Sequence, residues 1–406
     1  MWWVGLALVA SLVAVFAVMS VTKQRERERE RRAVSGPPVP GAQQWAGKRV
    51  CVVVNPIGGA GYGKRVFQRV LKPMLTNAGV LVDLIETEYK GHAHRILAEV
   101  DLTKYSAVLS VSGDGMLHEI VNGLWERHST FDSLPPLATI PAGTGNGLCT
   151  SFGARDPIAA TEMFLRGKTR GLDMMTVTSL DETKQVRPDS DRKLALMSVH
   201  WGLTADFDTL TELSFRKIGN MRFLITSVIV PGLLIYRAKS YKGRLSFVPY
   251  RNEHTDERGN YNKKYDGVNH DKQQKREQKA PSGEGDQDGE ERVVIEDYFF
   301  TLVAATVPWL AHDACLAPKA EMTDGYIDLF IVRGSNRGVY NEIQAFLNLD
   351  GGKICDLPFV EYFKVKNFFV EPLDDSDCGF YSIDGELVKA HPIKVDVQPS
   401  MGRFVY

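Results

Sequence analysis

Three glycine-rich stretches of the sequence contain the residue types that bind phosphate groups. They read NPIGGAGYGK at Asn55–Lys64, SGDG at Ser112–Gly115 and AGTGNG at Ala142–Gly147, and each follows an apolar run. Glycines let the backbone approach an anion closely, and a helix that starts there adds the positive end of its dipole. The first stretch nearly matches the GxxxxGK frame of a P-loop, but Arg65 stands where that motif has Ser or Thr. Together the three stretches predict a nucleotide or phosphate site.

Asp114 lies between the two glycines of the second stretch, at the expected end of a strand. A carboxylate in that position is poorly hydrated and close to a bound ligand, which suits a general base that deprotonates a hydroxyl group. The alternative is a turn residue whose side chain bonds to the nearby backbone. The pattern leaves both roles open.

Further charged residues that could serve a phosphate or a ligand lie in the second half of the chain. Asp206 and Asp208 fall on one face if their stretch, GLTADFDTL, is extended. The guanidinium groups of Arg216 and Arg222 have the fork geometry that suits polyphosphate. Near the end, YSIDGELV offers a carboxylate on each side of a glycine turn. Read alone, each of these patterns is more typical of a surface turn or an ion pair.

The elements that must position these residues divide the chain into two parts. Between residues 47 and 170, β-branched apolar runs alternate with helical patterns, which predicts a parallel sheet covered by helices. In such a sheet the loops after the strand ends meet at the ligand. Short alternating runs dominate residues 171–406, which predicts an antiparallel sandwich or barrel. Within this part, the apolar stretch 220–236 is expected to be a core helix or a lipid-pocket wall, and residues 251–292 are expected to be disordered.

The N-terminal segment differs from the rest of the chain. Residues 1–22 contain no charged side chain and are long enough for a transmembrane helix, which needs roughly 20 residues. Basic residues follow this segment, whereas a cleaved signal peptide has its positive charge in front. We therefore expect a single membrane anchor, a linker at residues 23–46 and a catalytic body in the cytosol. A cleaved signal peptide and a buried N-terminal helix are the alternatives.

Composition argues against several other classes of protein. A net charge of −1 gives no support for a nucleic-acid partner. The five cysteines are scattered and include no CxxC pair, which argues against a disulfide framework and a zinc site. The main body therefore has the pattern of a protein from a reducing compartment.

The order and spacing of these motifs resemble those of the eukaryotic sphingosine kinases, within the diacylglycerol-kinase catalytic superfamily. The resemblance runs from about Lys48 to Tyr406 and is carried by NPIGGAGYGK, SGDGMLHEIVNGL, IPAGTGNGL, GLTADFD, RKIGNMRF and IDGELV. It implies an N-terminal α/β domain with a Rossmann-like, phosphofructokinase-like parallel sheet, followed by an antiparallel β-sandwich domain that binds lipid. It also implies ATP and magnesium as cofactors.

The resemblance also implies roles for individual residues. Asp114 matches the general base, Asp208 the residue that reads the lipid head group, with Asp206 beside it, and Asp384 and Glu386 the residues that serve magnesium. The implied nucleotide contacts are Asn55, Pro56, Gly58, Gly59, Lys64, Thr87, Ser112, Gly113, Gly115, Gly143, Thr144, Gly145, Asn146, Arg216, Arg222, Asp384, Gly385 and Glu386. Two departures concern this assignment: the first glycine loop is longer than in many members, and an extra residue precedes RKIGNMRF.

We therefore expect ATP-dependent phosphorylation of the primary hydroxyl of sphingosine or a related long-chain base, giving sphingosine 1-phosphate. A sphingoid base has a protonated amine near this hydroxyl, which would pair with a buried carboxylate such as Asp208, whereas diacylglycerol and ceramide have no cation there. A kinase for diacylglycerol, ceramide or another lipid is the nearest alternative. A nicotinamide-dependent dehydrogenase and a non-catalytic, membrane-anchored nucleotide-binding protein are the others.

Overall fold

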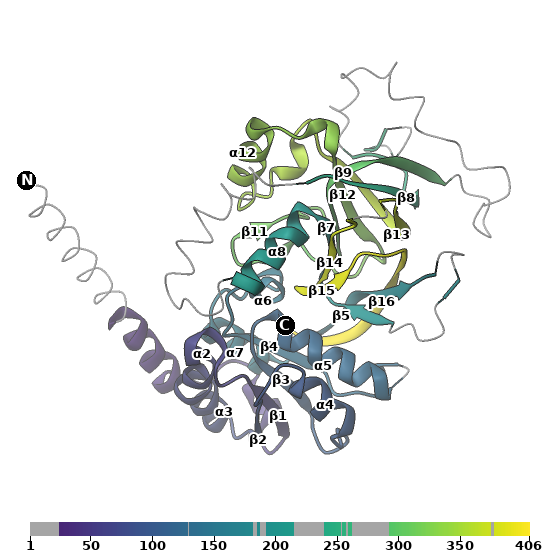
Figure 1. Cartoon of the computed structure of the whole chain (residues 1–406). Coiled ribbons are helices and arrows are strands. Elements are labelled where there is room, and N and C mark those ends of the chain that lie inside the picture. Colours follow the sequence, from purple (N-terminus) through teal and green to yellow (C-terminus); the bar gives the residue numbers. More distant parts are fainter. Residues whose placement is uncertain are drawn as a thin grey trace, which may run out of the picture.

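The computed structural model describes residues 24–406 except 129, 182–184, 187–191, 215–238, 253, 257–258, 262–291 and 375–376. The expected anchor at residues 1–22, the apolar stretch 220–236 and most of the insert expected to be disordered lie outside the described residues. Among the helices that are described, none is long and apolar enough to cross a bilayer. Figure 1 shows an α/β part, in purple and blue, below a β-rich part in green and yellow.

The α/β part contains four parallel strands in the order β2, β1, β3, β4. Their bounds are β1 (Arg49–Val54), β2 (Leu81–Glu86), β3 (Ala107–Ser112) and β4 (Leu137–Pro141). Alternate residues of β1 point into different cores, Val52 into one and Val53 into the other. Both faces of the strand are therefore apolar, as the continuous apolar run predicted.

Helices cover both faces of this parallel sheet. The first core is covered by α2 (Gly58–Val66), the π-helical turn Phe67–Leu71, α3 (Lys72–Asn77) and α7 (Pro157–Arg166). The second is covered by α4 (His92–Glu99), α5 (Asp114–Arg127) and α6 (Gly147–Ser151). The α/β prediction for this part of the chain is confirmed.

The β-rich part is antiparallel, as predicted, and begins with β5 at Thr169. Its strands are β5 (Thr169–Ser179), β6 (Lys193–Ala195), β7 (Ser198–Gly202), β8 (Tyr241–Pro249), β9 (Val293–Ala305), β10 (Trp309–Ala311), β11 (Ala314–Cys315), β12 (Ile327–Arg333), β13 (Glu361–Pro372), β14 (Phe380–Ile383), β15 (Glu386–Lys389) and β16 (Ile393–Val405). Both β8 and β12 pair with β9 and with β13, so these four strands close around a core that includes Trp201, Phe299 and Phe368. Among its described residues, this part also contains the α-helices α8 (Leu203–Ser214) and α12 (Val339–Leu347).

The last strand joins the two parts. β16 pairs along most of its length with β5, and its Phe404 also pairs in parallel with Leu137 of β4. In Figure 1 this yellow strand runs from the upper part down to the parallel sheet. One continuous sheet therefore passes through both parts.

Two segments differ from the sequence-based expectation. Residues 24–35, expected to belong to a linker, form a helix that docks on the α/β part through an Arg29–Asp156 ion pair of 2.8 Å. Val34 of this helix also packs against the first core. At the start of the insert, Asn260 is fully buried, and its Oδ1 accepts a hydrogen bond from the N–H of Tyr362 at 2.9 Å. This end of the insert therefore packs on β13, in contrast to the expectation for the insert as a whole.

Candidate active site

Asp114 is the first residue of α5 and lies where β3 ends. Its Oδ2 accepts a hydrogen bond from the N–H of Gly147 at 2.8 Å, and its Oδ1 accepts one from the N–H of Leu148 at 3.3 Å. Burial raises the pKa of this carboxyl to about 6, these backbone hydrogen bonds oppose the rise, and the negative charge of Asp384 adds to it. The carboxylate is thus ionised near neutral pH and basic enough to accept a proton.

The second and third glycine stretches pack against each other. A methyl group at Gly143 would lie 2.6 Å from the backbone nitrogen of Gly113, so only glycine permits this approach. Asn146, at a φ of 55°, accepts a hydrogen bond from the Gly143 N–H at 3.1 Å and donates one to the Gly143 carbonyl at 2.8 Å. A methyl group at Gly145 would lie 3.3 Å from Oδ2 of Asp114. The two turns therefore form one glycine-lined surface beside the candidate base.

The first glycine stretch is not an open P-loop. Helix α2 begins at Gly58, because Oδ1 of Asn55 accepts hydrogen bonds from the N–H groups of Ile57 at 3.2 Å and Gly58 at 2.9 Å. A methyl group at Gly63 would lie 2.5 Å from the carbonyl oxygen of Asn55, so this glycine lets the helix approach the end of β1. Lys64, farther along α2, pairs with Glu86 at 3.1 Å.

Apart from Lys64, the residues of the α/β part that the family resemblance implies as nucleotide contacts share one edge of the sheet. Asn55 follows β1, Thr87 follows β2 and Ser112 ends β3. Thr87 is buried and its N–H donates to the carbonyl of Val54 at 2.9 Å. The remaining members, which follow these strand ends, are Pro56, Gly58, Gly59, Gly113, Gly115, Gly143, Thr144, Gly145 and Asn146. Helices α2 and α5 begin at the same edge, and their N-termini favour an anion, so this edge fits the phosphates of ATP.

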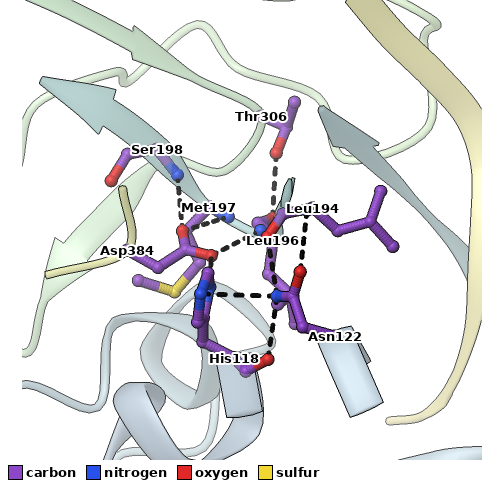
Figure 2. Close-up of polar contacts among 8 residues, drawn as sticks. All are labelled: His118, Asn122, Leu194, Leu196, Met197, Ser198, Thr306 and Asp384. Carbon is purple, nitrogen blue, oxygen red and sulfur yellow. Dashed lines mark hydrogen bonds and ion pairs between the residues drawn. The ribbon is translucent and has the colours of Figure 1, made fainter. Parts of the chain in front are cut away.

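Asp384 connects the β-rich part to this edge (Figure 2). Its Oδ1 accepts hydrogen bonds from the N–H groups of Met197 at 2.9 Å and Ser198 at 3.0 Å. Its Oδ2 accepts one from the N–H of Leu196 at 2.7 Å, and it lies 2.9 Å from Nδ1 of His118. The side chain is 1% exposed. Both oxygens are thus already used within the protein.

His118 places its contact with Asp384 one helical turn from the candidate base. It follows Asp114 by four residues on α5, so both side chains lie on the same face of the helix. Its second ring nitrogen lies 3.3 Å from Nδ2 of Asn122, whose Oδ1 accepts a hydrogen bond from the Leu194 N–H at 2.9 Å. The role of His118 is not evident from the sequence, because its partner Asp384 is 266 positions away and no local pattern marks the pair.

The implied magnesium does not fit Asp384 as a direct ligand. Both oxygens of Asp384 accept hydrogen bonds, and the second implied ligand, Glu386, pairs with Lys90 at 2.8 Å. Within the described part of the chain, no group of three or more His, Cys, Asp or Glu side chains is arranged to hold a metal ion. Asp384 is better explained as the residue that fixes the turn between β14 and β15.

A cavity of about 690 Å³ lies beside His118. It is lined by residues of α5, including Glu119 and Trp125, and by the Lys90–Glu386 pair. Glu119 also accepts a hydrogen bond from the N–H of Gly91 at 2.9 Å, which fixes the loop before α4. Of these residues, only Glu386 is suggested as a site residue by the sequence motifs, because the cavity is lined by segments that lie far apart in the sequence.

The two carboxylates of GLTADFDTL do not share a face, contrary to the expectation. Their stretch forms helix α8, and residues two positions apart on a helix point in different directions. Asp206 accepts a hydrogen bond from the hydroxyl of Tyr241 at 3.0 Å. Asp208 instead accepts one from the hydroxyl of Ser382, on β14, at 2.6 Å. Arg216 and Arg222, expected to bind phosphate, lie outside the described residues.

Ser382 and Asp384 connect Asp208 to the candidate base. Ser382 contacts Asp208, Asp384 follows two residues later, and His118 joins Asp384 to the helix that begins with Asp114. The charge of Asp384 also contributes to the raised pKa of Asp114, in agreement with their proximity. The backbone after Ser382 and the His118–Asp384 contact therefore link the strand that contacts Asp208 to the helix that begins with Asp114.

Comparisons with known proteins agree with this architecture. Residues 49–177 match the diacylglycerol kinase catalytic domain, and residues 287–405 match the YegS C-terminal NAD kinase beta sandwich-like domain. Sphingosine kinase 1 of Arabidopsis thaliana is 30% identical over 357 residues, which cover 84% of this chain and 68% of that protein. This chain belongs to the sphingosine kinase family.

Further relatives of this sphingosine kinase family member extend the agreement. Human sphingosine kinase 1 is 29% identical over 364 residues, which cover 87% of this chain and 89% of that protein. The crystal structure of a diacylglycerol kinase from Bacillus anthracis shares the fold, with a TM-score of 0.55 and 15% identity over 88% of this chain and 97% of that one. The chain is accordingly an ATP-dependent lipid kinase, as the sequence motifs predicted.

Proposed function

We propose that this kinase transfers the γ-phosphoryl group of ATP to the primary hydroxyl of sphingosine or a related sphingoid long-chain base, giving sphingosine 1-phosphate. The connection between Asp114 and Asp208 supports this proposal most directly. Asp208 contacts β14 through Ser382, and the Asp384–His118 contact joins the turn after β14 to the helix that begins with Asp114. The names of the relatives agree with it.

Asp114 is the proposed general base. Its pKa of about 6 leaves it ionised at neutral pH, so it can accept the proton of the attacking hydroxyl. The N–H groups of Gly147 and Leu148 hold its two oxygens in place before the substrate arrives. Phosphoryl transfer depends mainly on such positioning and on stabilising the charge of the phosphates.

The glycine-lined edge of the parallel sheet is the proposed site of the ATP phosphates. The N-termini of α2 and α5 face this edge, and the glycines let an anion approach the backbone. Magnesium accompanies ATP in this proposal and neutralises phosphate charge when bound. No protein ligand is assigned to it.

Asp208 is the proposed head-group residue. Its side chain is 31% exposed, and a hydroxyl, that of Ser382, donates to its Oδ2. A carboxylate in such a position pairs favourably with the ammonium of a sphingoid base, whereas diacylglycerol and ceramide have no cation near the reacting hydroxyl that could pair with it. Diacylglycerol and ceramide are therefore the less favoured substrates.

A panel of lipids tests the proposed reaction. Purified protein is incubated with labelled ATP and sphingosine, diacylglycerol or ceramide in mixed micelles, and the labelled lipid is separated and counted. We expect labelling of sphingosine that is lost in Asp114→Asn, while this variant keeps its fold and binds ATP. Preferred labelling of diacylglycerol or ceramide would contradict the proposed substrate, and normal turnover by Asp114→Asn would contradict the proposed base.

The role of Asp208 has a matched control two residues away. We expect Asp208→Asn to raise the KM for sphingosine about tenfold or more, because the variant loses the charge that pairs with the amine. Asp206→Asn is the same substitution at a residue that contacts Tyr241 instead of Ser382. The KM of this variant for sphingosine should therefore stay near that of the wild type. Equal effects of the two substitutions would remove the argument for an amine substrate.

The apolar segment at residues 1–22 is proposed as a membrane anchor that keeps the kinase next to its lipid substrate. The test compares the full chain with a chain that starts at residue 23, using flotation with phospholipid vesicles after a carbonate wash. Carbonate-resistant flotation only of the full chain supports an integral anchor. Equal behaviour of the two chains would contradict it.

A further inference from the structure

His200 is a buried histidine next to the proposed head-group residue. It lies in the middle of β7, on the face that α8 covers, and its side chain is 12% exposed. Both ring nitrogens are buried and find no hydrogen-bond partner among the described residues. Since an unpaired buried polar group costs free energy, its presence calls for a physical explanation.

The neighbours of His200 place it in the lipid part of the site. It pairs across the sheet with Ser382 of β14, whose hydroxyl donates to Asp208. Its Nδ1 lies 3.9 Å from Oδ2 of Asp208, which is too far for a hydrogen bond. The two side chains are therefore adjacent without satisfying each other.

The ring of His200 is neutral near pH 7. Burial lowers its pKa, and this effect exceeds the opposing influence of the negative charges of Asp208 and Asp384. A neutral imidazole has one nitrogen that donates and one that accepts a hydrogen bond. A hydroxyl group, which can both donate and accept, is the natural partner for such a ring.

We propose that His200 is a specificity-determining residue that hydrogen-bonds the secondary hydroxyl group of a sphingoid base, which is on the carbon next to the amine-bearing carbon. In this arrangement Asp208 binds the ammonium, and the primary hydroxyl remains free to react. In such a base the amine and this hydroxyl are on neighbouring carbons, which matches the adjacent side chains of a carboxylate and a neutral imidazole 3.9 Å apart. Diacylglycerol has only ester oxygens or hydrogen atoms near its free hydroxyl, so it offers this ring no second hydroxyl. The proposal rests on the proposed sphingoid-base activity and assigns one of its contacts.

The experiment compares two substrates that differ only in this hydroxyl. Steady-state kinetics are measured with a saturated sphingoid base and with its analogue that keeps the primary hydroxyl but lacks the secondary hydroxyl. For the wild type we expect kcat/KM to be about tenfold or more higher for the hydroxylated base, mainly through KM. In His200→Phe, kcat/KM for the hydroxylated base should fall to about the value for the analogue, so that the ratio approaches one.

Two further variants and a stability measurement separate this role from a purely structural one. His200→Gln, which can still donate and accept, should restore part of the ratio. His391→Phe is the matched control, because the ring nitrogens of His391 already contact the Ser179 hydroxyl and the Lys389 carbonyl. This variant should keep the wild-type ratio. The melting temperature of His200→Phe should not fall, because the substitution removes two buried nitrogens that have no partner among the described residues.

The outcomes distinguish the two proposals. If the wild type phosphorylates neither base, the proposed function and the role of His200 both fail. If the wild type phosphorylates the bases but the ratio is unchanged in His200→Phe, only the role of His200 is overturned. A lower melting temperature with equal losses on both substrates would show that His200 acts through the fold, which also overturns it.

Discussion

His118 and Asp384 are 266 positions apart, and Nδ1 of the histidine lies 2.9 Å from Oδ2 of the aspartate. This contact joins α5, which begins with the proposed base, to the turn between β14 and β15. Because the same carboxylate accepts backbone hydrogen bonds from residues just before and within β7, it fixes three elements at once. The geometry of the active site therefore depends on a side chain that need not touch either substrate.

Substitution of Asp384 should reveal this structural role. We expect Asp384→Asn to lower the free energy of unfolding by about 3 kcal/mol, because an amide group would face donors that now have a carboxylate. Glu386→Gln, at a partly exposed residue paired with Lys90, is the control and should change it by less than about 1 kcal/mol. Chemical denaturation measures both. A wild-type stability for Asp384→Asn together with weaker ATP binding would instead support a ligand role.

The rate should depend on pH through Asp114. Its pKa is raised from 3.8 to about 6, so the protonated form, which cannot accept a proton, predominates below that pH. We expect kcat/KM to fall about tenfold per pH unit below this pKa and to level off above it. A measured pH profile without an inflection between pH 5 and 7 would contradict this assignment.

The same shift in pKa has a consequence for stability. Because the folded pKa of Asp114 is higher than the unfolded value, its favourable contribution is complete below 3.8 and is lost as the pH rises through about 6. The wild type should therefore become less stable relative to Asp114→Asn as the pH rises across this window. Paired denaturation curves at pH 4 and pH 7 measure the difference, and an opposite trend would refute it.

Gly143 and Gly115, two glycines near the candidate base, should respond differently to substitution by alanine. Gly143→Ala places a methyl group against the backbone of Gly113, so we expect a destabilised protein with little activity. At Gly115 a methyl group meets nothing within 4 Å among the described residues, so Gly115→Ala should fold normally. If the ATP phosphates contact this turn, Gly115→Ala should raise the KM for ATP. Normal ATP kinetics in this variant would exclude close approach of the phosphates at Gly115.

Much of the fold was predictable because it depends on local patterns. The apolar run of β1 is buried on both faces, and alternation of strands with helices gave the parallel sheet. The glycine stretches after β3 and β4 were likewise visible, because each glycine requirement follows from a turn. In contrast, the start of α2 at Gly58 depends on two hydrogen bonds to Asn55, which glycine content alone does not reveal.

The contacts between distant segments could not be predicted from the sequence. The partners of Asp384 are strand-end backbone groups and a helix residue, none of which has a motif of its own. Asp206 and Asp208 would share a face only in an extended stretch, but their stretch forms a helix that covers β7 and β14, and this separates their roles. His200 has no sequence signature at all, since what marks it is the lack of a described partner for its ring.

The return of β16 to the parallel sheet has a consequence for biosynthesis. Phe404 and Val405 are buried in the two cores that flank this sheet, although the rest of the α/β part is encoded more than 200 positions earlier. The ribosome therefore finishes nearly all of the described α/β part long before the strand that completes it is available. During this interval the edge of β4 that later pairs with β16 has no neighbour. Chaperones should therefore need to protect the nascent chain until residue 405 has emerged.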